Sequence, residues 1–405
     1  GKISFEDESR FDVHIRNGDL ERILGLLGSS TRASGSLDAG FSLRGSLSDP
    51  RLSSTLSVAD ATSGEYHLGD LQADLLYADS SLSWNTSFHQ PDGNRITGSG
   101  LLPLIPSEDD DSFRIPGDRP LRFLLAIDRF DVSTLNPIVD AADRLDGVLR
   151  ADISIENTLD HPRVDGYMLL DSAAFLNTSL GLSYDQIRVR VLGENEKLLL
   201  DDFRIRSGEG ILTASGYLGR PTDFLDRSLR QAELNVQARR FVLANGRNLE
   251  MTIDGDMGLT AADDSASLTG NMTIVRSNFW LPAFFEQMRN RPSAGELPLL
   301  VQATQGDRDT RPLVLEAPAK PSPKLFKNLR GTVRIDSPRN TWFRSPDINL
   351  EINGTLDVLI SGDSLQLFGF LRVYRGTFLV YGKRFEVVEG RLDFHGGTSL
   401  FPSIS

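Results

Sequence analysis

The chain has 405 residues, enough for two or three ordinary domains or for one long repetitive one. Its formal net charge of −13 argues against nucleic-acid binding, and no polybasic cluster is present to hold an anionic membrane surface. The absence of cysteine excludes a disulfide framework, a thiol nucleophile and thiolate zinc sites, and no apolar run is long enough to span a bilayer.

The chain begins inside what is predicted to be a strand. Residues 1–5 carry no signal-peptide pattern, so we expect a fragment of a longer protein. Short helices are predicted at 19–27, with Asp19 as the cap, and at 136–142, with Pro137 at the first helical position. Two more are predicted at 222–232 and 282–289. Nearly everything else alternates apolar and polar residues between Gly, Asp, Asn and Ser, which predicts an all-β chain.

An internal repeat organises the first half of the chain. Pro50 follows Gly35 by 15 positions, and Pro162 follows Gly147 by the same 15 positions. Both prolines are followed by Arg and an aliphatic residue. A predicted short helix lies upstream of each glycine. Two segments that agree in spacing and in flanking residues indicate a true repeat.

Two looser copies of the repeat begin at Gly255 and Gly354. The predicted division is therefore a first β repeat at 1–119, a second at 120–231, a third at 232–325 and a C-terminal meander at 326–405. The third unit includes a proline-rich insertion at 291–323, and a proline-rich, acidic loop ends the first unit.

The last unit has the most regular alternation. Apolar residues fall at every second position within short runs, the spacing of a strand with one apolar face. Hairpin turns are predicted at 361–363, 375–376, 381–383 and 389–390. The residues predicted to share the apolar face, and to line a groove if that face is open, are Ile348, Leu350, Ile352, Leu356, Val358, Ile360, Leu371, Val373, Phe378, Val380, Phe385, Val387, Leu392 and Phe394.

The predicted helices are too few to cover such apolar faces. Turns every 8–12 residues would give roughly 30–35 strands, and an open sheet of that size must curl, split or close. We therefore expect an elongated antiparallel sheet curled into a U-shaped trough with an apolar interior groove, about 140 Å long. Periodicity alone also allows a row of closed sandwiches or a solenoid with a dry core.

The sequence shows no arrangement of catalytic or metal-binding residues. Its five histidines are scattered, namely His14, His67, His89, His161 and His395. The acidic run Glu108–Asp111 is typical of a solvated loop, although it could hold calcium weakly. Gly208-Glu209-Gly210 opens no helix and so predicts no phosphate site. We expect a protein that is not an enzyme and that needs no cofactor or metal.

The C-terminal segment resembles a known family. Residues 367–397 read L-F-G-F-L-R-V-Y-R-G-T-F-L-V-Y-G-K-R-F-E-V-V-E-G-R-L-D-F-H-G-G and are followed by Pro402. This string resembles the C-terminal domain of the TamB family, part of the translocation and assembly module. The repeats at Gly35 and Gly147 resemble AsmA-like modules, and residues 339–344 match a short basic and aromatic element of the family.

The resemblance implies a periplasmic, envelope-spanning bridge-like lipid-transfer protein, anchored to the inner membrane by a segment absent from this chain. It implies phospholipid as cargo and a TamA-like barrel of the Omp85 class as partner. The chain is expected to stop before the strands that approach that barrel. The alternative function is a scaffold or chaperone that hands β-strands to outer-membrane protein or autotransporter assembly. A β-solenoid stalk is a third hypothesis. The sequence leaves the lipid, its direction and the energy source open.

Overall fold

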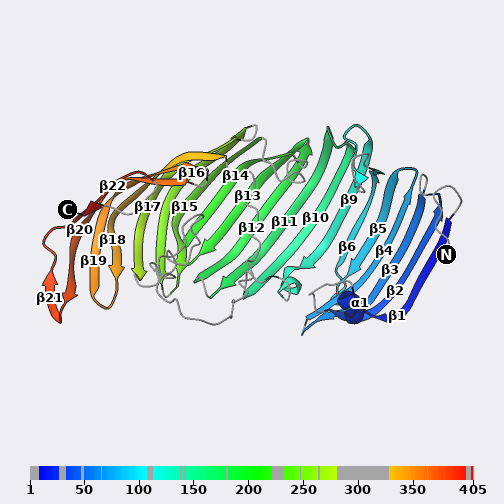
Figure 1. Ribbon diagram of the computed structural model, residues 1–405, viewed down its shortest axis with the longest axis horizontal. Coiled ribbons are helices and arrows are strands. Elements are labelled where there is room, and N and C mark those ends of the chain that lie inside the picture. Colours follow the sequence, from blue (N-terminus) through cyan, green and yellow to red (C-terminus); the bar gives the residue numbers. More distant parts are fainter. Residues whose placement is uncertain are drawn as a thin grey trace, which may run out of the picture.

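One large β-sheet makes up nearly all of this protein (Figure 1). The computed structural model describes residues 9–26, 33–46, 50–64, 66–106, 113–136, 139, 143–178, 181–220, 231–246, 248–262, 265–280, 328–362, 364–397 and 403–404. The sheet has 21 strands, which lie side by side from the N-terminal end to the C-terminal end. The elongated all-β sheet predicted from the sequence is confirmed.

The strands follow one another across the sheet almost in chain order. Their bounds are β1 Ser9–Asp19, β2 Ser34–Gly45, β3 Pro50–Ser63, β4 Tyr66–Ala78, β5 Ser81–His89, β6 Arg95–Pro103, β9 Pro120–Asp131, β10 Arg144–Thr158, β11 Pro162–Asn177, β12 Leu182–Asn195, β13 Lys197–Ser207, β14 Gly210–Gly219, β15 Gln231–Asn245, β16 Leu249–Ala262, β17 Ser265–Trp280, β18 Leu329–Arg344, β19 Ile348–Ser361, β20 Ser364–Val380, β21 Lys383–Glu386, β22 Arg391–His395 and β23 Ser403–Ile404. A separate two-stranded ribbon, β7 Ile105–Pro106 with β8 Phe113–Arg114, stands between β6 and β9.

Neighbouring strands are antiparallel with one exception. β17 and β18 run parallel, and the residues that join them, 281–327, lie outside the described part, as do the predicted helix at 282–289 and the insertion at 291–323. β21 and β22 both pair with β20, at different places along it. β1 does not pair with any of the last strands among the described residues, so the sheet is open.

Two short helices lie at the edge of the sheet. Helix α1, Leu20–Leu26, confirms the first predicted helix, and the Asp19 carboxylate accepts a hydrogen bond from the Arg22 N–H at 3.2 Å. The 3-10 helix η1, Val132–Leu135, lies just before the predicted helix at 136–142, most of which falls outside the described residues. Asp131 caps η1 by accepting from the Ser133 N–H at 2.9 Å. The third predicted helix, 222–232, is also mostly undescribed, and its final residues belong to β15.

β-bulges interrupt most pairings between β1 and β20, the exceptions being β4–β5, β5–β6, β6–β9 and β14–β15. An extra residue on one strand bends that strand and increases its local twist. Because the bulges recur from strand to strand, their bends add up and curve the whole sheet.

A carboxylate on the neighbouring strand holds several of these bulges. Asn17, Asp60, Arg240 and Asn340 all have left-handed backbone conformations, with φ between 47° and 61°. The N–H of each donates to an acidic side chain one strand away: Asp38 at 2.9 Å, Asp70 at 2.9 Å, Asp254 at 2.5 Å and Glu351 at 3.0 Å. A backbone donor that the bulge removes from the ladder is thereby satisfied.

The sheet curls toward its apolar face. β12 and β15 converge around the tip of the β13–β14 hairpin, where the Asn245 N–H donates to the Gly181 carbonyl at 2.8 Å. There Tyr184 of β12 stacks on Phe241 of β15 with ring centroids 5.4 Å apart. The Tyr184 hydroxyl also donates to the Leu243 carbonyl at 2.9 Å. Side chains on the apolar face are therefore brought together on the inside of the curve.

The structure corrects two details of the sequence prediction. The described residues form 23 strands, fewer than the 30–35 expected, because the main strands run for 9 to 17 residues. The turn predicted at 375–376 is wrong: β20 continues through Arg375 and Gly376, and a bulge at Tyr374 absorbs the irregularity. The break at 389–390 separates β21 from β22 but is not a hairpin, since both strands pair with β20.

Candidate functional site

Register partners place one apolar row across the sheet from β2 to β20. Residues directly opposite each other on neighbouring strands share a face, so a row can be followed from strand to strand. The row, here called the apolar row, runs Leu37, Val58, Leu71, Phe88, Ile96, Ile127, Ala151, Met168, Val191, Leu200, Gly216, Leu234, Leu259, Leu268, Gly331, Ile360, Leu365. Each member is apolar or glycine, from β2 to β20.

A second row lies beside the first on the same face. It begins at β9 and ends at β20, and again every member is apolar or glycine: Phe130, Leu149, Leu170, Val189, Phe203, Ala214, Val236, Met257, Gly270, Val333, Val358, Leu367. Two adjacent rows make a continuous apolar band on the inside of the curve, here called the concave face.

Short elements cover parts of the concave face, including four members of the apolar row. Leu20 and Ile23 of α1 pack against Leu37 and Val58, and η1 packs beside Ile127 and Ala151. Phe113 of the β7–β8 ribbon meets the ring of Tyr77 edge-on, with centroids 5.6 Å apart. Among the described residues, α1, η1 and this ribbon are the only regular elements outside the large sheet.

Large apolar side chains remain partly uncovered at both ends of the concave face. At the N-terminal end these are Phe11, Val13, Phe41 and Leu75, which register places on one face. At the C-terminal end Leu365 is 46% exposed. The largest apolar patch on a typical soluble monomer is a few hundred Å², and larger exposed patches usually mark binding sites. The concave face is therefore the candidate site.

The predicted groove residues of the last unit share this face. On β19 they are Ile348, Leu350, Ile352, Leu356, Val358 and Ile360, at alternate positions. Phe378 is the partner of Ile348, and Val373 is the partner of Ile352, because the bulge shifts the register between them. Leu371 and Leu392 are partners in the same way. Most of these side chains are half-buried, while Ile352 and Leu371 are buried.

The remaining predicted residues lie near the free end of the sheet. Phe385 stacks on Phe378 with centroids 5.3 Å apart, and Phe394 lies opposite Gly369. Val387 lies outside the strands, with its N–H bonded to the Gly376 carbonyl at 2.9 Å. The backbone of Val380 pairs with Lys383, and the side chain of Val380 lies outside the described part.

Sequence reasoning missed the members of the face contributed by β1 to β18. Each of those strands carries the same alternation, so the signal was present. Bulges such as those at Asp60, Ser172 and Arg240 add one residue to a strand. Beyond the bulge, the residues that face the apolar side change from odd to even positions or the reverse, so a strict period of two assigns them to the wrong face.

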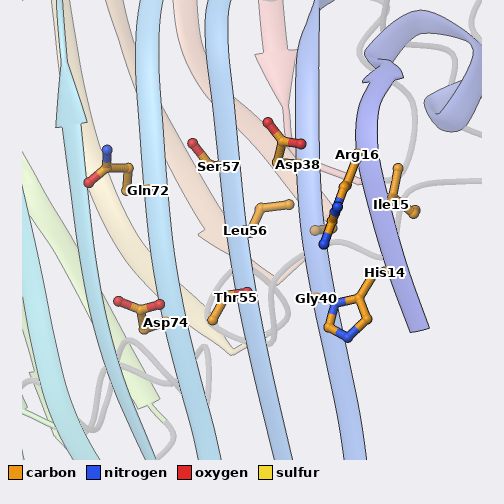
Figure 2. A pocket seen from close by; sticks show the side chains of 11 residues that line it. His14, Ile15, Arg16, Asp38, Gly40, Thr55, Leu56, Ser57, Gln72 and Asp74 are labelled. Carbon is orange, nitrogen blue, oxygen red and sulfur yellow. The ribbon is translucent and has the colours of Figure 1, made fainter. Parts of the chain in front are cut away.

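The opposite face is polar and holds a small pocket (Figure 2). His14, Gly40, Thr55 and Asp74 are successive register partners across β1 to β4, and the pocket they line has a volume of about 420 Å³. Gly40 keeps its floor open, since a Cβ there would lie 2.9 Å from the Thr55 hydroxyl. No group of His, Asp and Glu in the described residues is arranged to hold a metal ion.

Two carboxylates, Asp12 of β1 and Asp143 just before β10, are stabilised in their charged form. Hydrogen bonds from the Ser42 side chain and from Arg10 lower the pKa of Asp12. The Thr178 hydroxyl and N–H lower the pKa of Asp143. On the concave face, burial raises the pKa of the Tyr184 hydroxyl. These shifts favour the charged form of the two carboxylates and the neutral form of Tyr184.

The comparisons with known proteins point to one family. The family model of the TamB C-terminal domain matches residues 201–405, just over half of the chain, from within β13 to the end. No match was found among curated proteins or among solved structures. In the described residues, no helix has the length and apolar character that a bilayer span requires.

Proposed function

Because the chain belongs to the TamB family, we propose that its concave face is a track for phospholipid acyl chains moving between inner and outer membranes. The family acts in the assembly of envelope proteins and lipids with outer-membrane partners and is not known for enzymatic activity. The observation that supports the proposal is the apolar row, which continues from Leu37 to Leu365 without a polar member.

Acyl chains suit such a track because they require only apolar contact. Each methylene removed from water contributes about 0.8 kcal/mol, so a lipid tail favours the concave face over solvent. Successive strands present similar side chains, so neighbouring positions along the row differ little in energy and a tail can slide between them. Head groups would stay at the open edges of the trough, in contact with water.

The proposal extends to location and partners. We place the chain in the periplasm of the cell envelope, tethered to the inner membrane by a segment outside this chain. Its proposed partners are phospholipid and a TamA-like barrel of the Omp85 class. Membership of the family supports an envelope location and outer-membrane partners in general. Phospholipid as cargo and the barrel as partner are our additional proposals.

A photo-crosslinking amino acid placed on either face tests the lipid track. Val358 lies on the concave face, and its neighbour Leu359 lies on the polar face of the same strand. Val191 and Leu192 form a second such pair. After expression in cells with labelled phosphate, crosslinks to phospholipid are expected at Val358 and Val191 and not at their neighbours.

If solvent exposure alone determined crosslinking, Leu359 would be labelled more than Val358, since Leu359 is exposed and Val358 is half-buried. Equal lipid labelling at both members of each pair would contradict the proposal. Crosslinks to outer-membrane protein segments in place of lipid would favour the alternative scaffold function.

A further inference from the structure

Several strands end at the lower edge of the sheet near its C-terminal end (Figure 1), and aromatic and basic residues stand at or near these ends. β17 ends at Trp280 and β18 at Arg344, which are register partners, and β21 begins at Lys383 on the same edge, with β19 and β20 between β18 and β21. The Leu379 N–H donates to the Asp347 carbonyl at 2.7 Å and so joins the end of β20 to the β18–β19 turn. We call this edge the C-terminal rim: Trp280, Trp342, Arg344, Arg375, Tyr381, Lys383 and Arg384.

Arginine and aromatic side chains stack on the polar face of the rim. The guanidinium carbons of Arg344 and Arg375 lie 5.2 and 5.4 Å from the centre of the Trp342 ring. Arg375 is paired with Glu351, whereas Arg344, Lys383 and Arg384 form no ion pair with any described residue. The Nε of Arg344 is buried and has no hydrogen-bond partner in the described part. Three cationic groups are therefore available to an external anion.

The tip of the β20–β21 hairpin and the segment after β21 each project one bulky side chain into solvent. Tyr381 is 100% exposed, and Val388, beyond β21, is 95% exposed. Tyr381 also has a left-handed backbone conformation, with φ of 49°, which is uncommon for a residue other than Gly, Asn or Asp. Two of the three tryptophans of the chain belong to the same rim, and Trp280 is 38% exposed.

Charge is distributed unevenly along the molecule. The whole chain has a net charge of −13, whereas residues 328–405 hold nine Arg and Lys against eight Asp and Glu. An anionic surface would repel the acidic body and would attract the rim, so the molecule would meet such a surface by its C-terminal end. Asp347 and Glu386 are the acidic residues of the rim and limit this attraction.

We propose that the C-terminal rim docks on the head-group layer of an anionic lipid bilayer. Arg344, Lys383 and Arg384 would contact lipid phosphates, and Tyr381 with the two tryptophans would lie at the level of the head groups. Tyrosine and tryptophan favour this interface because their rings are amphipathic, and each basic residue near an anionic bilayer adds attraction. Most of the rim lies on the polar side of the sheet, whereas Lys383 is the register partner of Val380. The docking is proposed for the strand ends and does not require a lipid track on the concave face.

An acidic protein segment is the other occupant that the charges allow. The fully exposed tyrosine at the hairpin tip favours the bilayer, because ion pairing with an acidic peptide does not require an aromatic side chain in solvent. The guanidinium–indole stacks point the same way, since they hold both groups at one surface.

Vesicle flotation tests the docking with the full chain. Vesicles of phosphatidylglycerol and phosphatidylcholine are expected to carry the protein at low salt, and vesicles of phosphatidylcholine alone are not. The double variant Lys383→Glu with Arg384→Glu should weaken binding at least about tenfold, given the attraction contributed by each basic residue. Tyr381→Asn should also weaken binding without loss of stability, because asparagine tolerates the left-handed conformation.

The matched control is Arg44→Glu with Arg51→Glu. These two exposed arginines are register partners on the polar face at the other end of the sheet. Neither stacks on an aromatic ring of the described residues. The control should bind like the unaltered chain. The proposal would be overturned if control and rim variants lost vesicle binding equally, or if the unaltered chain bound polyglutamate but no vesicles. Circular dichroism checks that each variant is folded.

Discussion

A single buried carboxylate organises the bulges of the last strands. Glu351 is 2% exposed and accepts the Asn340 N–H at 3.0 Å and the Arg375 Nε–H at 2.6 Å. Burial raises the pKa of this carboxyl, but the hydrogen bond from Asn340 and the hydrogen bond and charge of Arg375 outweigh it, so the pKa lies below its usual value. One side chain thus links the bulge of β18 to that of β20.

Glu351→Gln should destabilise the C-terminal end by about 2 kcal/mol, because it removes a charge-assisted hydrogen bond at a buried site. Because the pKa of Glu351 is lower in the folded protein than in the unfolded chain, the carboxylate stabilises the fold fully at pH values above its unfolded-state pKa. This stabilisation is lost as the pH falls through its folded-state pKa. The difference between the two proteins in urea unfolding, followed by tryptophan fluorescence, should therefore be full at neutral pH and should shrink in acid. A difference that stays constant down to about pH 2 would contradict this account.

Close backbone approach requires certain glycines. Gly216, a member of the apolar row, has φ of 143°, and a Cβ there would lie 2.0 Å from the Glu233 carbonyl oxygen. Gly258, two strands away, has no atom closer than 3.9 Å to such a Cβ. Replacing Gly216 tests backbone strain, whereas replacing Gly258 tests the effect of losing a glycine without strain.

Gly216→Ala should destabilise the sheet by about 2 kcal/mol or more, because the backbone must move to admit the methyl group. Gly258→Ala is the matched control and should be neutral or stabilising by up to about 1 kcal/mol, since it restricts the unfolded chain without strain. Thermal and urea unfolding of both variants measure this. Similar losses in the two would show that the contact at Gly216 is not the cause.

At the scale of elements, two strand ends are built alike. β1 and β9 each end in an aspartate that caps a short helix, Asp19 for α1 and Asp131 for η1. At the second of these, Gln90 accepts the Asp131 N–H at 3.1 Å and donates to the Thr134 hydroxyl at 3.3 Å. The repeat seen in the sequence thus corresponds to a repeated local structure, while the division into four units stays a prediction.

Asp131→Ala should cost about 1 kcal/mol, the usual contribution of a helix cap. The loss should be local, so hydrogen exchange should accelerate in residues 132–136 and remain unchanged in β15 and β16. Asp131→Asn is the control, because its amide oxygen can still accept the Ser133 N–H. Faster exchange throughout the sheet would mean that Asp131 has a global role.

The whole molecule is an elongated trough that lacks a second layer in the described residues. β1 to β20, without β7 and β8, form a ladder of eighteen strands, which at about 4.8 Å per strand gives a length of about 80 Å. This is shorter than the 140 Å expected from the sequence because the strands are fewer and longer. Local contacts between neighbouring strands dominate, as in repeat proteins.

Small-angle X-ray scattering should show this shape. A compact protein of this length would have a radius of gyration of about 21 Å, and we expect a clearly larger value with a maximum dimension of at least about 80 Å. Maltose-binding protein, a compact protein of similar size, is a suitable standard. A radius near the compact value would indicate that the sheet folds onto itself and that the concave face is closed.

The sequence by itself determined the strands, their two unlike faces and the family. Period-two alternation fixes which side chains share a face within a strand, so residues such as Leu356 and Val358 could be grouped without a structure. The family followed from residues 367–397 and is confirmed by the match over residues 201–405. The strands and their faces depend on residues close together in the sequence, and the family is identified from the sequence itself.

Only the tertiary structure decided which face is concave, how far its apolar row continues and what gathers at its edges. The Tyr184–Phe241 stack and the bulge at Tyr374 depend on register between strands, which no local pattern encodes. The basic residues of the C-terminal rim come from β18, β20 and β21, so the sequence shows no polybasic cluster. Pairing of distant strands brings them to one edge, because register, not sequence distance, sets which side chains meet.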